Sequence, residues 1–178
     1  GPIGVHEMAQ RAIASGLFEG PVPRQHLSQN IEHSPIHNAW QEKRDHLLPE
    51  DFPSEEVTVY SDYLLNKGPA YGQVGGVHDI LKGSNGQTYV VKEADAILAK
   101  QLFESIEGID IMTPGAVALA SLQQALASGE VESSSPTVLN ISGGGVNRYK
   151  QDQETEILEP WLRVKKANGA MKILEALQ

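Results

Sequence analysis

The sequence contains no cysteine, few aromatic residues and few basic side chains. The absence of cysteine excludes disulfide bonds, thiolate catalysis and cysteine-ligated zinc, and it fits a reducing, cytoplasmic location. With 14 basic against 23 acidic residues, the net charge of −9 argues against nucleic-acid or anionic-membrane partners, which need a basic face. No apolar run approaches the roughly 20 residues that span a bilayer. No basic segment followed by an apolar one opens the chain, so we expect no signal peptide.

The hydrophobic share of 40% in 178 residues is enough for a globular core, and we expect a single α/β domain over 1–178, with its tail, 151–178, the least defined part. Strand and helix patterns alternate, which predicts a three-layer α/β sandwich with a mainly parallel sheet. Asn85-Gly86 is a hairpin-turn signal before a β-rich run. The expected strands are 24–29, 88–91 and 137–141, and the expected helices are 5–15, 34–47, 93–106, 114–128 and 169–177.

The most informative segment is the apolar run 137–141, which leads directly into Ser142 and three glycines. Ligands of open α/β sheets bind beyond the carboxyl ends of strands, where glycines let the backbone approach a ligand closely. A ligand loop with Ser142 facing a crevice is one interpretation. A flexible surface turn after a core strand explains the pattern about equally well. The segment matches neither a Walker nor a Rossmann fingerprint.

Two other segments could carry chemistry. Glu107 and Gly108 close the predicted helix 93–106, and the glycine is a standard helix C-cap. Glu107 is mildly unfavourable at the negative end of a helix dipole, which hints at another role. The glycine-rich stretch 69–76 is read as a plain loop in preference to a mobile lid.

The six histidines do not predict a metal site. His33 and His37 are four residues apart, which suits one face of a helix. Pro35 lies between them, and no HExxH pattern is present. We therefore expect no bound metal.

Several of these segments occur in the same order in one family. The opening Gly1-Pro2-Ile3-Gly4, the Glu107-Gly108-Ile109 before a second helix and the run 140–145 (NISGGG) resemble the C-terminal half of fold-type-II pyridoxal-phosphate enzymes. Within that family the chain looks most like the threonine-synthase branch and, inside it, the archaeal cysteate synthases. The stretches 27–30 and 69–79 support the resemblance, which covers most of 1–150.

The resemblance implies the fold of the C-terminal large domain of these enzymes, with pyridoxal phosphate held between two domains. Ser142 then matches the hydroxyl that bonds the pyridine nitrogen, with Gly143 beside it, and Glu107 matches a glutamate near the ring edge. Gly1 matches the last glycine of the phosphate-binding loop. The Schiff-base lysine is expected in a missing N-terminal half, since no lysine here stands in its sequence context.

A Gly-Pro start fits either a protease scar or a longer protein cut at this point, and the resemblance favours the cut. Alone, the chain is therefore expected to be catalytically inactive and to form no Schiff base with the cofactor. The implied activity of the whole enzyme is replacement of the phosphate of O-phosphoserine by sulfite, on the route to coenzyme M. The alternatives are a threonine synthase acting on O-phosphohomoserine and a non-catalytic α/β module for binding or assembly. A homo-oligomer is possible on the resemblance.

Overall fold

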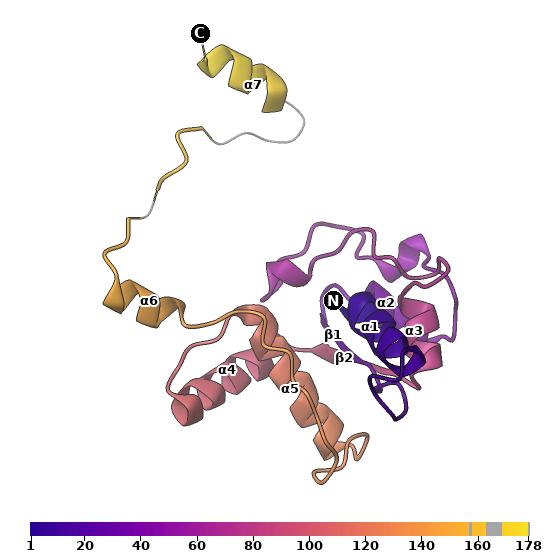
Figure 1. The fold of residues 1–178 in the computed structure, drawn as a ribbon. Coiled ribbons are helices and arrows are strands. Elements are labelled where there is room, and N and C mark those ends of the chain that lie inside the picture. Colours follow the sequence, from indigo (N-terminus) through magenta and orange to yellow (C-terminus); the bar gives the residue numbers. More distant parts are fainter. Residues whose placement is uncertain (157, 163–168, 178) are drawn as a thin grey trace. The chain divides into compact units, whose positions relative to one another are not determined.

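A computed structural model describes residues 1–156, 158–162 and 169–177 (Figure 1). The chain divides into two compact units, Gly1–Asn147 and Arg148–Gln178. The described residues form seven α-helices, two short 3-10 helices and a two-stranded parallel sheet. Every element up to residue 127 lies in the first unit. The α/β class is therefore confirmed. Whether the chain acts as a single domain over 1–178 stays a prediction.

The sheet consists of β1 (His26–Asn30) and β2 (Gln87–Val91), with His26 opposite Gln87 and Asn30 opposite Val91. Parallel strands need a long crossover connection, because the second strand must start at the same end as the first. That connection contains α2 (Pro35–Gln41), the 3-10 helices η1 (Pro49–Asp51) and η2 (Asp62–Leu64), and α3 (Val77–Gly83). The strands expected over 24–29 and 88–91 are thus confirmed, as is a parallel sheet.

Helices cover both faces of this sheet. Successive side chains of a strand point to opposite faces. On one face the Ser28 hydroxyl hydrogen-bonds that of Ser121 in α5 (Thr113–Ala127). On the other, Gln29 Oε1 accepts a hydrogen bond of 2.9 Å from the backbone N–H of His37 in α2. The layers are thus α5, sheet and α2, which is the three-layer arrangement expected.

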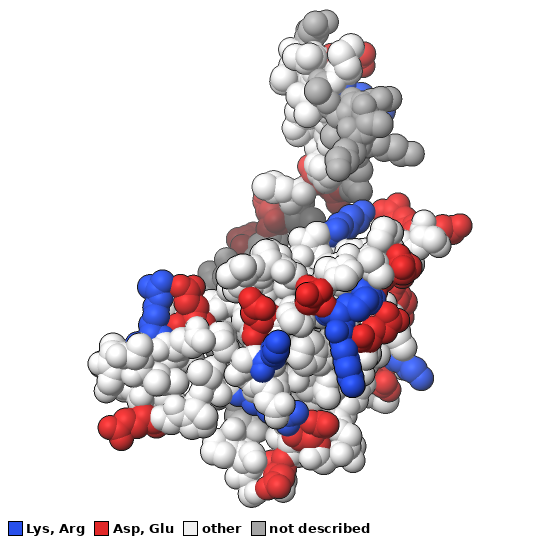
Figure 2. Space-filling model, turned by 90° about the vertical axis from the view of Figure 1, so that its right-hand side faces the viewer, with Lys and Arg blue, Asp and Glu red and all other residues white. Residues whose placement is uncertain are grey.

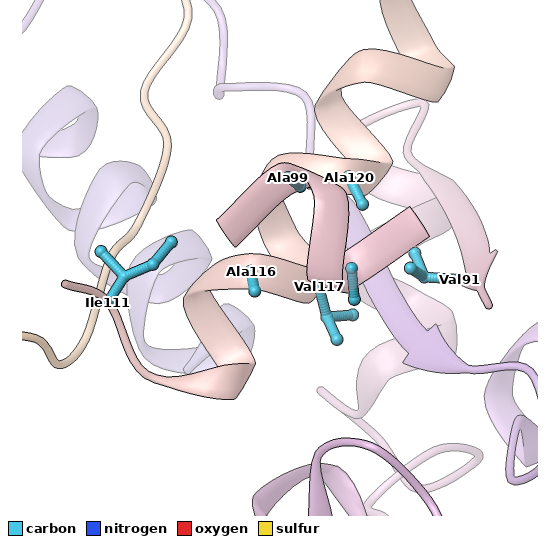
Figure 3. Packing of buried hydrophobic residues seen from close by; sticks show 7 residues of the cluster. Val91, Ala99, Ile111, Ala116, Val117 and Ala120 are labelled. Atoms are coloured by element: carbon cyan, nitrogen blue, oxygen red, sulfur yellow. The ribbon is translucent and has the colours of Figure 1, made fainter. Parts of the chain in front are cut away.

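The first core lies between β2, α4 (Glu93–Glu107) and α5, and Figure 3 shows its small side chains. Alanine at most helix positions lets the two helices approach each other and the sheet closely. The buried members are Val91, Ala96, Ala99, Ile111, Ala116, Val117 and Ala120. The spacing of Leu98, Leu102 and Ile106 predicted the α4 helix correctly, but this leucine-rich stripe is exposed and the alanine face is buried.

The second core lies on the α2 face and is built around Ala39, Tyr71, Val77 and Leu81. Ile3 of α1 (Pro2–Ala14) packs against it, as does Leu27 of β1. Tyr71 comes from the glycine-rich stretch 69–76 and is 1% exposed. Its hydroxyl donates to the Arg44 carbonyl oxygen at 2.9 Å, and burial raises its pKa to about 12. This stretch is therefore anchored in the core at Tyr71.

The hairpin expected at Asn85-Gly86 is wrong. These residues join α3 to β2, which pairs in parallel with β1 and not with a strand before the turn. Asn85 has a positive φ of 51°, the conformation that makes Asn-Gly a good turn in any context. Gly86 passes against β1: a Cβ there would lie 2.6 Å from the Gln25 carbonyl oxygen. The chain does turn at Asn85-Gly86, but the strand that follows the turn pairs with β1 and not with the segment just before the turn.

The strand expected over 137–141 does not form. This segment belongs to no sheet among the described residues, and the side chain of Val138 is 95% exposed. A strand needs a neighbour to satisfy its backbone N–H and C=O groups, and a run with high β propensity stays open to water without one. This is the main difference between the expected sheet and the observed one.

Most predicted helices agree with the structure to within a few residues. The exception is α2, expected over 34–47, which ends at Gln41, where Lys43 follows with a positive φ of 57°. The sequence patterns gave no sign of α6 (Val146–Asp152). The C-terminal helix expected over 169–177 is confirmed as α7 (Gly169–Ala176), while 157, 163–168 and 178 of the expected tail lie outside the described residues.

Acidic and basic side chains alternate over the face shown in Figure 2, with neither gathered into a continuous patch there. Across the described parts of the chain, no helix combines the length and apolarity that crossing a membrane would require.

Candidate functional site

The glycine-rich segment after Ser142 is held against the loop between α4 and α5. Ile111 and Gly144 form an antiparallel bridge. The backbone N–H of Met112 donates to the Gly143 carbonyl oxygen at 3.0 Å, and that of Gly145 donates to the Asp110 carbonyl oxygen at 2.8 Å. The loop that follows Glu107-Gly108 therefore meets the glycines after Ser142, two places that sequence analysis singled out separately.

Asp110 fixes the end of this segment. Its carboxylate oxygens accept hydrogen bonds of 3.1 Å from the backbone N–H groups of Val146 and Asn147, the first residues of α6. A carboxylate at a helix N-terminus satisfies donors that have no partner inside the helix and complements the helix dipole. Sequence reasoning did not assign this role. An acidic residue in an interhelical loop is the only signal, and it does not reveal which helix is capped.

The glycines are required by this close contact. A Cβ on Gly143 would lie 2.6 Å from Met112 Sδ, and one on Gly144 would collide with the Asp110 carbonyl oxygen. Gly145 has a φ of +71°, which L side chains rarely adopt. The packing of 109–112 thus explains the three glycines without a ligand, although it also fixes the backbone on which Ser142 is carried.

Ser142 itself is exposed, and its hydroxyl has no hydrogen-bond partner among the described residues. Its backbone is fixed from both sides: Ile141 packs on the first core, and Gly143 bonds Met112. The structure therefore presents a free hydroxyl from a positioned backbone. That is a suitable donor for a ring nitrogen.

Glu107 lies exposed on the last turn of α4, and Gly108 ends the helix with a φ of 68°. The C-cap expected of Gly108 is confirmed. Within the part of the chain that the structure describes, Glu107 makes no hydrogen bond or ion pair. The structure brings its loop to the Ser142 segment, but no contact joins the glutamate itself to Ser142.

Gly1 is the N-cap residue of α1, with Pro2 at the first helical position. Nothing lies within 4 Å of where a Cβ on Gly1 would be. The first turn contains no acidic residue, so its free amides and the positive end of the dipole are open to an anion. Gly1 and Ile141 line the same groove, which connects α1 to the segment before Ser142.

That groove has a volume of about 1310 Å³ and extends along β1. His26 and Tyr89 stack in its wall with ring centroids 5.7 Å apart, and Nδ1 of His26 lies 2.8 Å from the tyrosine hydroxyl. Burial, aided by the nearby Arg24, lowers the pKa of His26, while burial and Glu130 raise the pKa of Tyr89. Both rings are therefore neutral at neutral pH.

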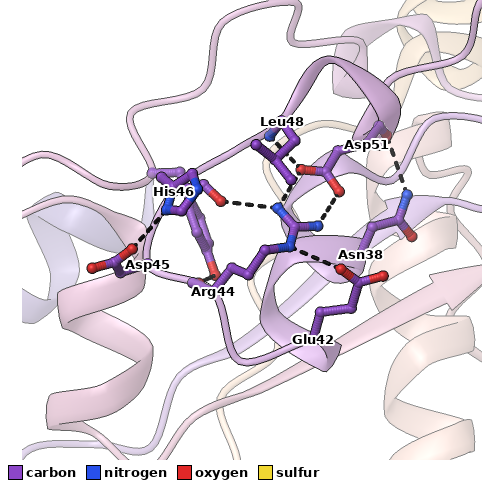
Figure 4. Close-up of polar contacts among 8 residues, drawn as sticks. Asn38, Glu42, Arg44, Asp45, His46, Leu48 and Asp51 are labelled. Atoms are coloured by element: carbon purple, nitrogen blue, oxygen red, sulfur yellow. Dashed lines mark hydrogen bonds and ion pairs between the residues drawn. The ribbon is translucent and has the colours of Figure 1, made fainter.

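A second polar cluster lies on the α2 side and was not foreseen (Figure 4). The Arg44 guanidinium binds both carboxylate oxygens of the buried Asp51 and also Glu42. Asp51 Oδ2 accepts from the Leu48 N–H at 2.7 Å, and its carbonyl oxygen accepts from Asn38 at 3.1 Å. The arginine holds the pKa of Asp51 below its usual range. All of these residues lie between β1 and β2 in the sequence, so the cluster stabilises the connection between the two strands.

The histidines considered for a metal are engaged elsewhere. His33 Nε2 lies 3.1 Å from the Asn66 carbonyl oxygen, and His37 Nδ1 lies 2.9 Å from the Thr88 hydroxyl. Burial lowers the pKa of His37, against the opposing effect of a hydrogen bond with the Thr88 backbone.

Comparison with known proteins finds similar sequences among cysteate synthases, while no family model matches the chain. The cysteate synthase of Methanosarcina barkeri is 41% identical over 164 residues, which are 90% of this chain and 39% of that protein. That of Methanocella arvoryzae is 42% identical over 168 residues, 92% of this chain and 40% of the relative. That of Methanospirillum hungatei JF-1 is 41% identical over 181 residues, 100% of this chain and 43% of the relative. The chain thus spans about two fifths of these relatives' length and matches their C-terminal half.

Proposed function

We propose, from its homology with the C-terminal half of the cysteate synthases, that this chain is the cofactor-binding part of an enzyme that converts O-phosphoserine and sulfite into cysteate and phosphate. The observation that carries the proposal is 35–42% identity along nearly the whole chain to proteins of that one name. The proposed setting is the cytoplasm of an archaeon, on the route to coenzyme M.

The reaction breaks the bond between the β-carbon of phosphoserine and its phosphate oxygen and forms a carbon–sulfur bond to sulfite. Pyridoxal phosphate, when bound, supplies the electron sink that acidifies the α-proton and lets the β-phosphate leave. The residues of this chain would hold and orient the cofactor. A neutral hydroxyl at the pyridine nitrogen suits this elimination and replacement chemistry, because it does not enforce protonation of the ring.

Ser142 is the proposed partner of the pyridine nitrogen. Its free, exposed hydroxyl on a fixed backbone supports this role, as does the small Gly143 beside it. Glu107 is proposed near the ring edge, because its loop contacts the Ser142 segment.

The N-terminus of α1 is the proposed site of the cofactor phosphate. Gly1 caps the helix without a side chain, and no acid lies in the first turn to repel an anion. Backbone N–H groups and the helix dipole together bind phosphate in many α/β proteins. The shared groove links this helix to Ile141, next to Ser142, so one cofactor could contact both.

The Schiff-base lysine would come from residues outside this chain. Alone, the chain is therefore expected to give no turnover and no borohydride-stable adduct with pyridoxal phosphate. A stoichiometric adduct on one lysine, together with phosphoserine turnover by the chain alone, would contradict this division of roles.

The activity is tested by joining this chain behind the N-terminal residues of the Methanospirillum hungatei relative, whose match covers all of it. We expect phosphate release from O-phosphoserine that depends on sulfite, with cysteate identified by mass spectrometry. Turnover of O-phosphohomoserine to threonine in its place would favour the threonine-synthase alternative. A fusion that binds cofactor but turns over neither substrate would favour a non-catalytic module.

Ser142→Ala in the same fusion tests the site. A neutral hydrogen bond contributes about 0.5–1.5 kcal/mol net, so cofactor affinity should fall by roughly tenfold at most. Ser142→Asp should instead change the visible spectrum, because a carboxylate favours a protonated ring nitrogen. The matched control is Ser134→Ala, an exposed serine in the preceding loop. Wild-type affinity and absorbance in both Ser142 variants would remove Ser142 from the site.

A further inference from the structure

The N-terminal end of α5 contacts the chain on both sides of Ser142. On one side Ile141 packs so close to the helix that a Cβ on Gly115 would lie 3.4 Å from its Cγ2 atom. On the other side the Gly143 carbonyl oxygen accepts a hydrogen bond of 3.0 Å from the backbone N–H of Met112, the N-cap residue of α5. The position of Ser142 is therefore set by the first turn of this helix.

A buried hydrogen-bond network holds that first turn. The hydroxyl of Thr113, the first residue of α5, donates to the Ser61 hydroxyl at 3.1 Å. The backbone of the buried Ser61 is bound in turn by the side-chain amide of Asn30: its N–H donates to Asn30 Oδ1 at 3.2 Å, and its C=O accepts from Asn30 Nδ2 at 2.9 Å. Asn30 is buried and is the last residue of β1. The network thus joins the start of α5 to the carboxyl end of the strand.

The network fixes geometry more than it buries surface. Tyr60 and Leu64, on either side of Ser61, pack against the first core, so apolar contacts already bury this segment. Buried polar groups are costly unless they are hydrogen-bonded, and a satisfied network permits few alternative arrangements. Its effect is therefore to set the distance and direction between β1 and α5.

The hydroxyl of Thr113 is not used as an ordinary helix cap. Threonine near a helix start commonly bonds the free backbone N–H groups of its own helix. Here α5 has no side-chain cap, and the hydroxyl points to Ser61, which lies 52 residues away in the sequence. A local signal for helix initiation is thus replaced by a long-range contact.

The other proposed cofactor anchor is also carried by β1. Ile3 of α1 and Leu27 of β1 pack against the same second core, and the N-terminus of α1 is the proposed phosphate site. The phosphate and the ring nitrogen of pyridoxal phosphate are joined through one rigid ring, so their separation is nearly constant. The two anchors must therefore be held in register, since a displacement of about 1 Å can cost on the order of a hundredfold in rate.

We propose that Thr113 is a positioning residue for the cofactor. Its hydrogen bond to Ser61 holds the first turn of α5 against the carboxyl end of β1 and so directs the Ser142 hydroxyl at the ring nitrogen. Thr113 acts through Met112 and Gly143 and does not itself touch the cofactor. The inference rests on the proposed function, because it requires Ser142 to be the partner of the ring nitrogen.

The first test uses the fusion with the N-terminal residues of the Methanospirillum hungatei relative, without cofactor. Thr113→Val keeps the shape of the side chain and removes its hydroxyl. Amide hydrogen exchange of 111–113 and 143–146, read by mass spectrometry, should accelerate by about threefold or more. Thr113→Ser, which retains a hydroxyl, should exchange like the wild type. The matched control is Thr58→Val, an exposed threonine, and it should leave this exchange unchanged.

The second test is a double-mutant cycle on cofactor affinity. Thr113→Val should weaken binding by roughly two- to tenfold, no more than Ser142→Ala does. In the Ser142→Ala background the same change should cost less than about twofold, because the hydroxyl that it positions is absent. If the single variant does not fold, Thr113→Val with Ser61→Ala removes both partners of the bond, which is better tolerated than leaving one buried hydroxyl unpaired. This pair should give the same loss of affinity.

The outcomes separate this inference from the function on which it rests. Unchanged exchange in Thr113→Val overturns it, whatever the affinities are. Equal losses of affinity with and without the Ser142 hydroxyl, or no recovery in Thr113→Ser, make the role of Thr113 purely structural and overturn it too. If Ser142→Ala alone binds cofactor like the wild type, the proposed site fails and takes this inference with it. An effect of Ser142→Ala that is not coupled to Thr113 is a failure of this inference alone.

Discussion

β2 and the segment 137–141 have similar compositions, but only β2 forms a paired strand. Each is a five-residue run with three β-branched side chains, QTYVV in 87–91 and TVLNI in 137–141. β2 pairs along its whole length with β1, and its Val91 is 2% exposed. The segment 137–141 has no strand partner in the described structure, and its Val138 is 95% exposed.

The difference shows that strand formation depends on a neighbour more than on the run itself. β propensity measures how well a side chain fits a pleated, half-buried surface, and that surface must first exist. β2 obtains it from β1 and α5. The other segment has α5 beside it, through Ile141, but lacks a strand to which its backbone can bond.

Matched valine substitutions should give the largest contrast. Val91→Ala removes two buried methyl groups and leaves a cavity, so the free energy of unfolding should fall by about 2 kcal/mol. Val138→Ala should change it by less than about 0.5 kcal/mol, because the side chain is in water. Urea unfolding followed by circular dichroism measures both. Equal losses would mean that 137–141 is packed as firmly as β2.

Gly144→Ala should loosen the backbone that directly follows the segment 137–141. The new Cβ would meet the Asp110 carbonyl oxygen, so the bridge between Ile111 and Gly144 must open, at about 1–2 kcal/mol. Gly68→Ala, where nothing lies within 4 Å and φ is not positive, is the matched control. Amide exchange of 142–147 should accelerate in the first variant only. Identical exchange in the two would argue against this contact.

Asp110→Ala should have a somewhat smaller effect in the same place. It removes the acceptor of two α6 amides, and loss of a helix cap costs about 1 kcal/mol. Glu107→Ala, three residues earlier and exposed, should cost almost nothing. Thermal unfolding of the two variants distinguishes a capping aspartate from a solvated one, and equal shifts would remove the capping role.

Mild acid should slightly lower the free energy of unfolding, through the two histidines that contact β2. The pKa values of His26 and His37 are lowered in the fold, so the unfolded chain, with an ordinary histidine pKa of about 6.5, takes up protons first. Stability should therefore fall as the pH drops through about 6.5, because of these two histidines.

The lowered pKa of Asp51 adds a further loss of stability below about pH 4, as that carboxylate is protonated. The histidine step is tested separately. His37→Gln should flatten the first step in denaturant midpoints measured from pH 7 to 5, and an unchanged slope would contradict the assignment.

Two segments of the candidate site could be singled out from the sequence, while the roles of Ser142, Gly143, Glu107 and Gly1 stay predictions. The run 140–145 and the pair Glu107-Gly108 were singled out separately, and the fold brings their segments together through Ile111 and Gly144. The capping role of Asp110 was not predictable, since its partners lie 36 and 37 residues away. The Arg44–Asp51 cluster was missed because charged residues in a loop look the same whether solvated or buried.

The sequence by itself determined the features that depend on near neighbours along the chain. Helical spacing and the glycine caps at Gly108 and Gly129 located α4 and α5, because a helix satisfies its own backbone within four residues. Only the tertiary structure decided that β2 pairs in parallel with β1, that α4 buries its alanine face and that 137–141 stays unpaired. Each of these depends on surfaces contributed by distant residues, and a strand in particular cannot satisfy its own hydrogen bonds.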